Sequence, residues 1–420
     1  MTTIMLAIFA VLLILSFPVG YALVIAGTVA VLAVGEVPTT VVLLKIFQPT
    51  QSFPLLAIPF FILAGSLLMS GQLGKQLVTF AATLVGRYRG GLGQVNVLGS
   101  AIFGGVSGSA VADASALGSI LIPWMRREGY PPALAAAITA SAAIIAVLIP
   151  PSVPMILFAA VSNESIASLF LAGIVPGLAL TAGLMLACWW VGRRNNLPVV
   201  DVERGWAVMG KATVAALPAI ILPLLILVLL RFGVATPTEV SVIAAAYALL
   251  VRAVLYRDLT IRRFGTDIII TAVTTGVVML VIIASNLIGW ILTTEDVPTR
   301  LADWALSTLR EPWLVILSMN ILMLVVGMFI DLPAAILLLG PIFVAVAQKI
   351  GLDLIQLGLM MTLNLAIGLF TPPVGTTLFV ASAIARQPIG AVVAQMWPFY
   401  LVAFALLLAV SYVPAFTIHF

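Results

Sequence analysis

Four short stretches of the chain place serine, threonine, glycine and proline inside apolar sequence. They are Ser107-Gly108-Ser109, Ile149 to Ser152, Gly327 to Pro333 and Gly368 to Thr376. Proline lacks an N–H and clashes with the preceding helical turn, so the pairs Pro150-Pro151 and Pro372-Pro373 leave carbonyl oxygens without a helical partner. Carbonyl and hydroxyl oxygens are the ligands that unwound helices offer to a hard monovalent cation such as Na⁺. These stretches therefore predict cation binding, and the positive N-termini of half-helices there favour an anion as well.

Close helix packing is an alternative reason for small residues, and it stays open for residues 99–105. At Ser107-Gly108-Ser109 the accompanying break at 150–152 favours the ion site.

Asp113 and Asp331 are the two carboxylates deepest in apolar sequence. Ionisable groups within a membrane are usually functional, which predicts proton binding or balancing of a cation's charge. Each acid also falls near an expected helix start, where a carboxylate stabilises the helix end, and both interpretations stay open.

An enzyme is not expected. Residues 105–108 fit the GxSG motif of intramembrane serine proteases, but a serine nucleophile needs a base, usually histidine. The single histidine is His419, which is expected to lie in solvent near the C-terminus and not to act as that base. Asp113 and Asp331 lack the glycine pattern of an aspartyl protease. No phosphate-binding G-x-x-x-x-G-K-[ST] occurs, so the predicted energy source is an ion gradient and no cofactor is expected.

The elements that hold these stretches must be membrane helices. The chain is 63% hydrophobic and 8% charged, whereas a soluble domain has roughly 25% charged residues. Several apolar runs approach the ~20 residues that cross a bilayer, among them Val214 to Leu230 and Ile268 to Leu292. The run from Ile4 to Val34 lacks a basic leader and is expected to be a retained first span. Because Cys188 is the single cysteine, the chain cannot form an internal disulfide. Its side chain is expected only to pack against other apolar groups.

The charges predict topology. The net charge is +4, and the basic residues are spread over many short loops, which argues against a nucleic-acid partner. Loops that carry pairs of basic residues are predicted to be cytoplasmic. Basic pairs flank residues 90–125 on both sides, so this segment should enter and leave the membrane on one side. Two pieces of about 16 residues reach ~24 Å each, which predicts a re-entrant helical hairpin that turns at Ser107-Gly108-Ser109.

The second half repeats the layout of the first about 220 residues later. Asp113 and Pro123 correspond to Asp331 and Pro341, and Pro150-Pro151 corresponds to Pro372-Pro373. The second hairpin lies between acidic flanks, so it should face the opposite side. Two repeats of opposite orientation are the architecture of many secondary transporters.

Three motifs carry a resemblance to a known family. FGGVSGSAVADASALGSILIPWM (103–125), LIPPSVPMILFA (148–159) and NLAIGLFTPPVGTTLFVASAIA (364–385) occur in the order found in the large membrane subunit of TRAP (tripartite ATP-independent periplasmic) transporters. The resemblance implies an all-α polytopic protein of the bacterial inner membrane, with about eleven spans and two re-entrant hairpins. It also implies Na⁺-coupled import of organic anions by an elevator mechanism. The implied partners are a small four-helix membrane subunit and a periplasmic substrate-binding protein.

The resemblance also implies site residues. A first ion site would use Ser107, Ser109, Pro150 and Ser152, around Gly108 and Pro151, with residues near Gly327. A second would use Gly368, Thr371, Pro372 and Gly375 with the tip of the outer hairpin. The implied substrate-facing residues are Ser109, Asn364, Thr376 and Thr377.

The same resemblance implies a division of the chain. Residues 1–89 would be N-terminal scaffold helices, 90–161 the first transport-domain repeat, 162–311 scaffold helices and linker, 312–386 the second repeat, and 387–420 a C-terminal helix.

Two alternative functions stay open. One is an ion-coupled dicarboxylate symporter that needs no binding protein. The other is a passive anion channel, since Gly- and Ser-rich re-entrant loops also build selectivity filters. Two unequal hairpins facing opposite ways favour alternating access over the channel.

Overall fold

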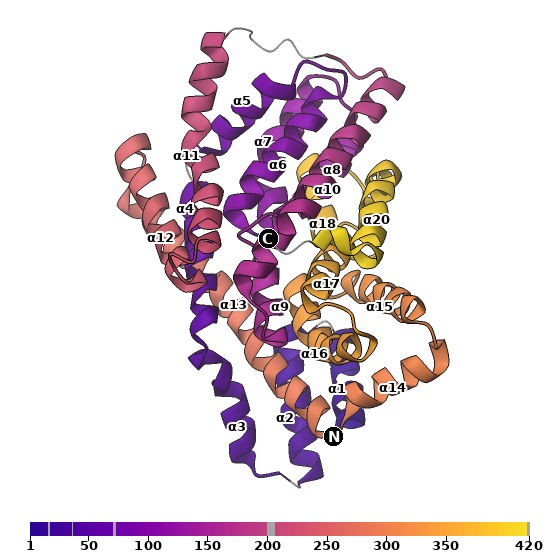
Figure 1. Ribbon diagram of the computed structural model, residues 1–420. Coiled ribbons are helices and arrows are strands. Elements are labelled where there is room, and N and C mark those ends of the chain that lie inside the picture. The colour runs from indigo at the N-terminus through magenta and orange to yellow at the C-terminus, as the bar shows by residue number, and fades with distance from the viewer. Residues whose placement is uncertain (16, 36, 70–72, 200–205, 418–420) are drawn as a thin grey trace.

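The chain folds into helices joined by short loops, as its apolar runs predict (Figure 1). The computed structural model describes residues 1–15, 17–35, 37–69, 73–199 and 206–417, so His419 lies outside the described residues. No strand occurs within these ranges. Helices satisfy all backbone hydrogen bonds within one segment, which lipid requires because it offers no partners. The all-helical fold class is confirmed.

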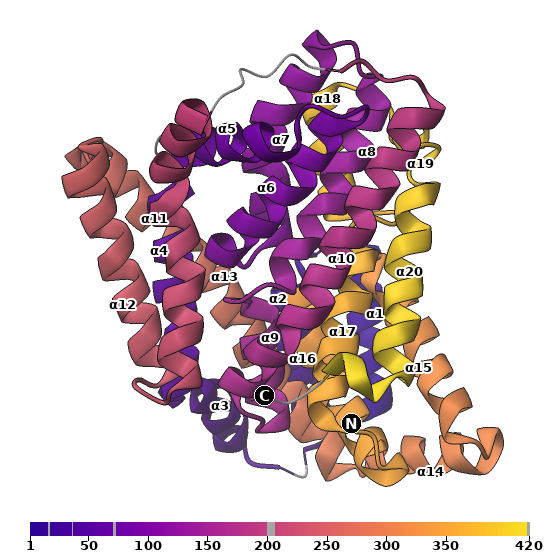
Figure 2. The same ribbon diagram turned by 45° about the horizontal axis from the view of Figure 1, so that its top comes forward.

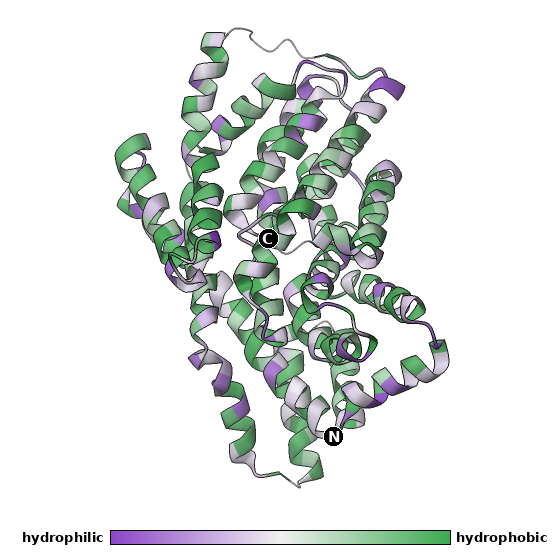
Figure 3. Ribbon diagram, viewed as in Figure 1, coloured by the Kyte–Doolittle hydropathy of each residue, from purple (hydrophilic) through white to green (hydrophobic). Residues whose placement is uncertain are grey.

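Long apolar helices supply the membrane-crossing elements. In the described ranges, five are long and apolar enough to cross a bilayer: α10 (Ile166–Arg194), α11 (Trp206–Arg231), α12 (Pro237–Leu250) with its continuation to Tyr256, α13 (Ile261–Thr294) and α16 (Leu332–Ile350). A pair bent by 57°, Thr39–Gln51 with Phe53–Met69, makes a sixth if counted as one span. Figure 3 shows apolar residues along most of the helix lengths. The total of about eleven spans stays a prediction.

The N-terminal apolar run differs from the expectation of a single first span. It forms two helices, α1 (Thr2–Ile14) and α2 (Val19–Val34), which pack against each other. Pro18 precedes the first residue of α2. Proline removes an N–H and disfavours helical backbone at the residue before it, which favours a break in the run at this point. A Cβ atom on Gly27 would lie 2.9 Å from Leu287, so this glycine lets α2 pack closely on α13.

Two parts of the chain share one order of elements. The first comprises α6 (Gly91–Ser107), α7 (Ala110–Arg127), α8 (Pro132–Ala142) with a 3₁₀ turn to Val147, and α9 (Val153–Ser162). The second comprises α15 (Pro312–Gly327), α16, α17 (Leu354–Gly368) and α18 (Thr376–Ala385). Pro123 and Pro341 lie within the second helix of each set. Figure 1 shows α6 and α7 toward one end of the molecule and α15 and α16 toward the other.

The two sets interlock. Helix α18 of the second set packs against α7 and α8 of the first, and α9 of the first packs against α16 and α17 of the second. The Thr377 hydroxyl on α18 donates to the carbonyl oxygen of Ala140 on α8 at 3.4 Å. In Figure 2, α18 lies beside α8 toward the top of the view, and α9 lies near α16 and α17 in the middle. Each set therefore completes the packing of the other.

A buried ion pair joins helices outside these sets. Nη1 of Arg252, in the π-helical turn Val251–Tyr256 that continues α12, donates to Oδ2 of Asp267 on α13 at 2.6 Å, and both side chains are 1% exposed. Nε of Arg252 also donates to Asp258 at 3.2 Å. The Ser66 hydroxyl on α4 (Ala57–Met69) donates to the other oxygen of Asp267 at 3.2 Å. Three helices are thus tied together at one buried carboxylate.

Candidate functional site

The first predicted break is a tight turn between α6 and α7. Helix α6 ends at Ser107, and Gly108 has φ +59°, a left-handed conformation that glycine adopts at little cost. Ser109 caps α7, because its Oγ accepts from the Ala112 amide at 3.4 Å. The Ser107 hydroxyl accepts from the Ser109 amide at 3.4 Å. The turn leaves both serine hydroxyls beside irregular backbone, as the sequence predicts.

The turn contacts the second predicted break. A Cβ atom on Gly108 would lie 2.5 Å from the carbonyl oxygen of Pro151, which follows the cis Pro150-Pro151 bond. Ser152 caps α9: its hydroxyl donates to the Val147 carbonyl at 2.6 Å and accepts from the Met155 amide at 3.4 Å. Residues 107–109 and 150–152, far apart in sequence, are therefore neighbours and bring hydroxyl and carbonyl oxygens together.

The third and fourth breaks also meet. Helix α15 ends at Gly327 and α17 ends at Gly368, and a Cβ atom on Gly368 would overlap the Gly327 backbone. The first set has a matching contact, since a Cβ atom on Gly104 would lie 2.5 Å from the Cα atom of Ala146. The structure thus places Gly327, which the sequence analysis assigned to the first ion site, against Gly368 at the break predicted for the second.

Hydroxyl groups bind several carbonyls of the Gly368 to Thr376 stretch. Thr371 Oγ1 donates to the Ile367 carbonyl at 2.6 Å, and Thr377 Oγ1 to Leu369 at 2.9 Å. The Tyr400 hydroxyl, from α20 (Trp397–Tyr412), donates to the Phe370 carbonyl at 2.8 Å. Gly375 has φ +50° and, like Gly108, permits the turn before a helix start, while Pro372-Pro373 is cis. The hydroxyl of Thr377 is engaged by the fold; the sequence did not indicate Tyr400, which lies 30 residues along the chain from Phe370.

Asn364 and Thr376 lie on α17 and α18. Asn364 Nδ2 donates to the backbone oxygen of Asn320 at 2.9 Å and to its side-chain oxygen at 2.8 Å, while Asn364 Oδ1 is buried without a hydrogen-bond partner. Thr376 Oγ1 is likewise buried and unpartnered. Asn320 was missed by the sequence reasoning, although an asparagine inside the apolar run 312–327 is a usable signal. These two unpartnered oxygens are the candidates to meet a substrate.

The two predicted acids have different surroundings. Asp113 is fully buried in the first turn of α7, where Oδ2 accepts from the Ser100 hydroxyl on α6 at 2.7 Å and Oδ1 has no partner. One turn before Ser100, Asn96 donates to Thr139 of α8 at 2.6 Å. Asp331 instead precedes α16 as its N-cap residue, is exposed and makes no cap hydrogen bond. Both acids sit at helix N-termini, which favours the helix-end interpretation, and only Asp113 is also deeply buried.

In the described part of the chain, no three His, Cys, Asp or Glu side chains lie together in a group that could hold a metal ion. Cys188 is buried in α10. The oxygens gathered at the breaks are hydroxyls and backbone carbonyls, which suit a hard cation of low charge. The donor set at residues 107–109 and 150–152 therefore fits Na⁺.

Several known proteins similar to this chain are named as large permease proteins of TRAP transporters. The chain is 51% identical over 419 residues to uncharacterized protein y4mL of Sinorhizobium fredii, with both chains covered completely. It is 36% identical to the 2,3-diketo-L-gulonate TRAP transporter large permease protein YiaN of Escherichia coli, covering 95% of this chain and 94% of that protein. It is 38% identical to the C4-dicarboxylate TRAP transporter large permease protein DctM of Pseudomonas aeruginosa, covering 89% and 87%.

The fold has a solved counterpart. The structure of the YdaH transporter of Alcanivorax borkumensis superimposes with a TM-score of 0.61 at 17% identity, covering 88% of this chain and 86% of that one. This likeness concerns the fold alone. The family model of the tripartite ATP-independent periplasmic transporter, DctM component, matches residues 6–416. By this match and its relatives, the chain belongs to the DctM family, the large permease component of TRAP transporters.

Proposed function

We propose that this permease imports organic anions together with Na⁺ by an elevator motion. The observation that carries the proposal is the interlocking of the two helix sets, with α18 held by α7 and α8 and α9 held by α16 and α17. We propose that helices packed in this way move as one body. The body comprises α6 to α9 and α15 to α18, and the remaining helices form the scaffold against which it slides.

Coupling to Na⁺ is supported by the oxygens at the breaks. The Pro151 carbonyl faces Gly108, and the hydroxyls of Ser107, Ser109 and Ser152 lie on the same two segments. The first ion site is proposed here. The second is proposed at Gly368 to Gly375, where unwound backbone surrounds Thr371. Ion occupancy at the breaks would fix the helix ends that face the substrate.

The substrate is proposed to be a carboxylate or a sugar acid, because relatives are named for 2,3-diketo-L-gulonate and C4-dicarboxylate transport. N-termini of α7, α9, α16 and α18 at the breaks supply positive partial charge for the carboxylate. Asn364 and Thr376 carry the unpartnered oxygens that meet its hydroxyl groups. A periplasmic binding protein delivers the substrate, and a small membrane subunit completes the complex in the inner membrane.

The test is uptake of labelled organic acids into proteoliposomes that hold the chain with its small subunit. The Na⁺ gradient and the binding protein are varied separately. Saturable uptake that requires both supports the proposal. Uptake that needs Na⁺ but no binding protein would indicate an independent symporter, and unsaturable flux that needs neither would indicate a passive channel.

A further inference from the structure

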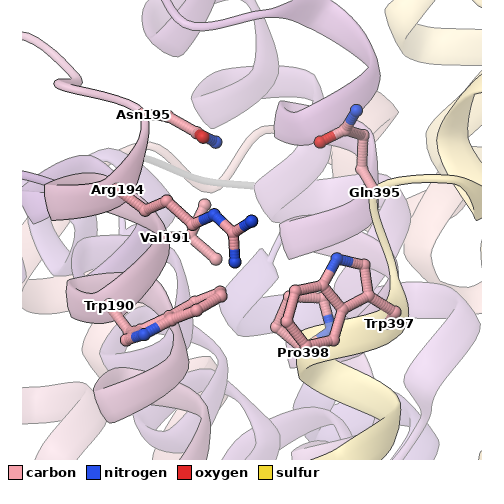
Figure 4. A pocket seen from close by; sticks show the side chains of 7 residues that line it. All are labelled: Trp190, Val191, Arg194, Asn195, Gln395, Trp397 and Pro398. Carbon is pink, nitrogen blue, oxygen red and sulfur yellow. The ribbon is translucent and has the colours of Figure 1, made fainter.

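A pocket lies between the end of α10 and the start of α20, away from the four breaks. Its walls come from two helix ends: Trp190, Val191, Arg194, Asn195, Gln395, Trp397 and Pro398 (Figure 4). Its volume is about 120 Å³. Since roughly 10–15 Å³ admits one water molecule, the pocket has room for a polar group of several atoms.

The pocket is built around one arginine. The guanidinium carbon of Arg194 lies 5.1 Å from the centre of the Trp190 ring, and the Trp190 and Trp397 rings meet edge to face with centres 5.2 Å apart. In Figure 4 the guanidinium points between the two rings, with the Asn195 and Gln395 amides beyond it. None of the described residues that line the pocket is acidic. A stacked guanidinium with free N–H groups is suited to a phosphate, because its planar fork matches two phosphate oxygens.

The surroundings place the pocket where lipid headgroups lie. A second arginine–tryptophan stack is adjacent in sequence, with Arg193 over Trp189 at 4.4 Å, and Arg89 donates to Asn196. Tryptophan and arginine collect at the cytoplasmic membrane–water boundary, where anionic lipids are also enriched. A basic, aromatic site of this kind is expected at the depth of the headgroups.

Apolar surface continues from the pocket toward the membrane centre. Leu186 lies one turn before Trp190 on α10, and Leu401 lies one turn after Trp397 on α20. Their side chains are 65% and 62% exposed. Residues four apart on a helix share a face, so each leucine lies below one wall of the pocket. An acyl chain has a track here that a free phosphate would not use.

We infer that this pocket binds the phosphate of an anionic phospholipid, with Arg194 contacting the phosphate, Trp190 and Trp397 flanking the headgroup, and Leu186 and Leu401 contacting the acyl chains. The site is separate from the proposed ion and substrate sites. It anchors the junction of α10 and α20 to the lipid of the cytoplasmic leaflet.

The experiment is native mass spectrometry of the purified full chain in detergent, titrated with phosphatidylglycerol or phosphatidylcholine. Wild type should retain phosphatidylglycerol in preference to phosphatidylcholine. Arg194→Gln should weaken that retention roughly fivefold, because one basic residue near the surface contributes about that factor. Arg127→Gln is the matched control, an exposed arginine in the last turn of α7, and should retain the lipid as wild type does.

A second variant and a soluble probe separate the remaining outcomes. Trp397→Leu keeps an apolar wall but removes the ring pair, and should also lose retention, which covers the case that Arg194→Gln does not fold. Equal retention by wild type and either folded variant overturns the proposal. So does inorganic phosphate that displaces phosphatidylglycerol and stabilises wild type but not Arg194→Gln, since the pocket would then take a soluble phosphate.

Discussion

The carbonyl oxygen of Pro151 lies 2.5 Å from the position that a Cβ atom would take on Gly108. Two segments more than forty residues apart therefore touch through bare backbone, and glycine alone fits there. The contact joins the turn of the first hairpin to the break between α8 and α9. If this junction is an ion site, its geometry depends on the absence of one methyl group.

Gly108→Ala should lower stability. The substitution places a side chain at φ +59° and against the Pro151 carbonyl, and the left-handed conformation alone costs about 1–2 kcal/mol. The thermal unfolding midpoint in detergent measures the loss. Gly99→Ala, within α6, is the control, because its Cβ atom would make an ordinary 3.5 Å contact with Leu117. Equal midpoints for the two variants would show that the junction does not restrict residue 108.

Ser107→Ala should remove most of the stabilisation by Na⁺. A ligand at 100 times its dissociation constant stabilises the folded state by about 2.7 kcal/mol, and this gain depends on the site's oxygens. In K⁺ the variant should unfold close to wild type, since the hydroxyl only accepts one long hydrogen bond. The measurement is the unfolding midpoint in Na⁺ minus that in K⁺. Ser119→Ala, an exposed serine of α7, is the control; a full Na⁺ response in Ser107→Ala would falsify the assignment.

Ser100→Ala should destabilise the protein through Asp113. The Ser100 hydroxyl donates to Oδ2 of the buried Asp113, and leaving a buried polar group without its hydrogen bond costs about 1–3 kcal/mol. Ser141→Ala is the matched control, because that buried hydroxyl donates within its own helix to Ala137. A double-mutant cycle with Asp113→Asn isolates the pair. A coupling energy near zero would mean that the two side chains do not depend on each other.

Asp267→Ala should be more damaging than the loss of a surface ion pair. The substitution leaves the buried Arg252 without its 2.6 Å partner, and breaking a buried pair costs about 3–5 kcal/mol. Asp258 keeps its own contact with Arg252, so the lower end of that range is expected. Asp303→Ala is the comparison, since its pair with Lys349 is exposed and contributes about 0–1 kcal/mol. Comparable unfolding midpoints for the two variants would contradict a structural role for the buried pair.

The helix breaks were predictable because they depend on local rules. The clusters of glycine, serine and proline at 107–109, 149–152, 327–333 and 368–376 disfavour helical backbone locally, and all four interruptions are present. The correspondence of Pro150-Pro151 with Pro372-Pro373 likewise needed only the order of residues. Pro18 was an equally local signal that was overlooked, and it divides the first apolar run into α1 and α2.

The sequence by itself determined the membrane class, the repeat and the positions where backbone becomes irregular, because composition and turn chemistry act over a few residues. Tertiary structure decided which irregular segments meet: Gly108 lies against Pro151, and Gly327 lies against Gly368. It also decided that Tyr400 binds the Phe370 carbonyl, that Asn320 binds Asn364, and that Asp113 is buried while Asp331 is exposed. These contacts follow from the packing of helices distant in sequence, which no local pattern encodes.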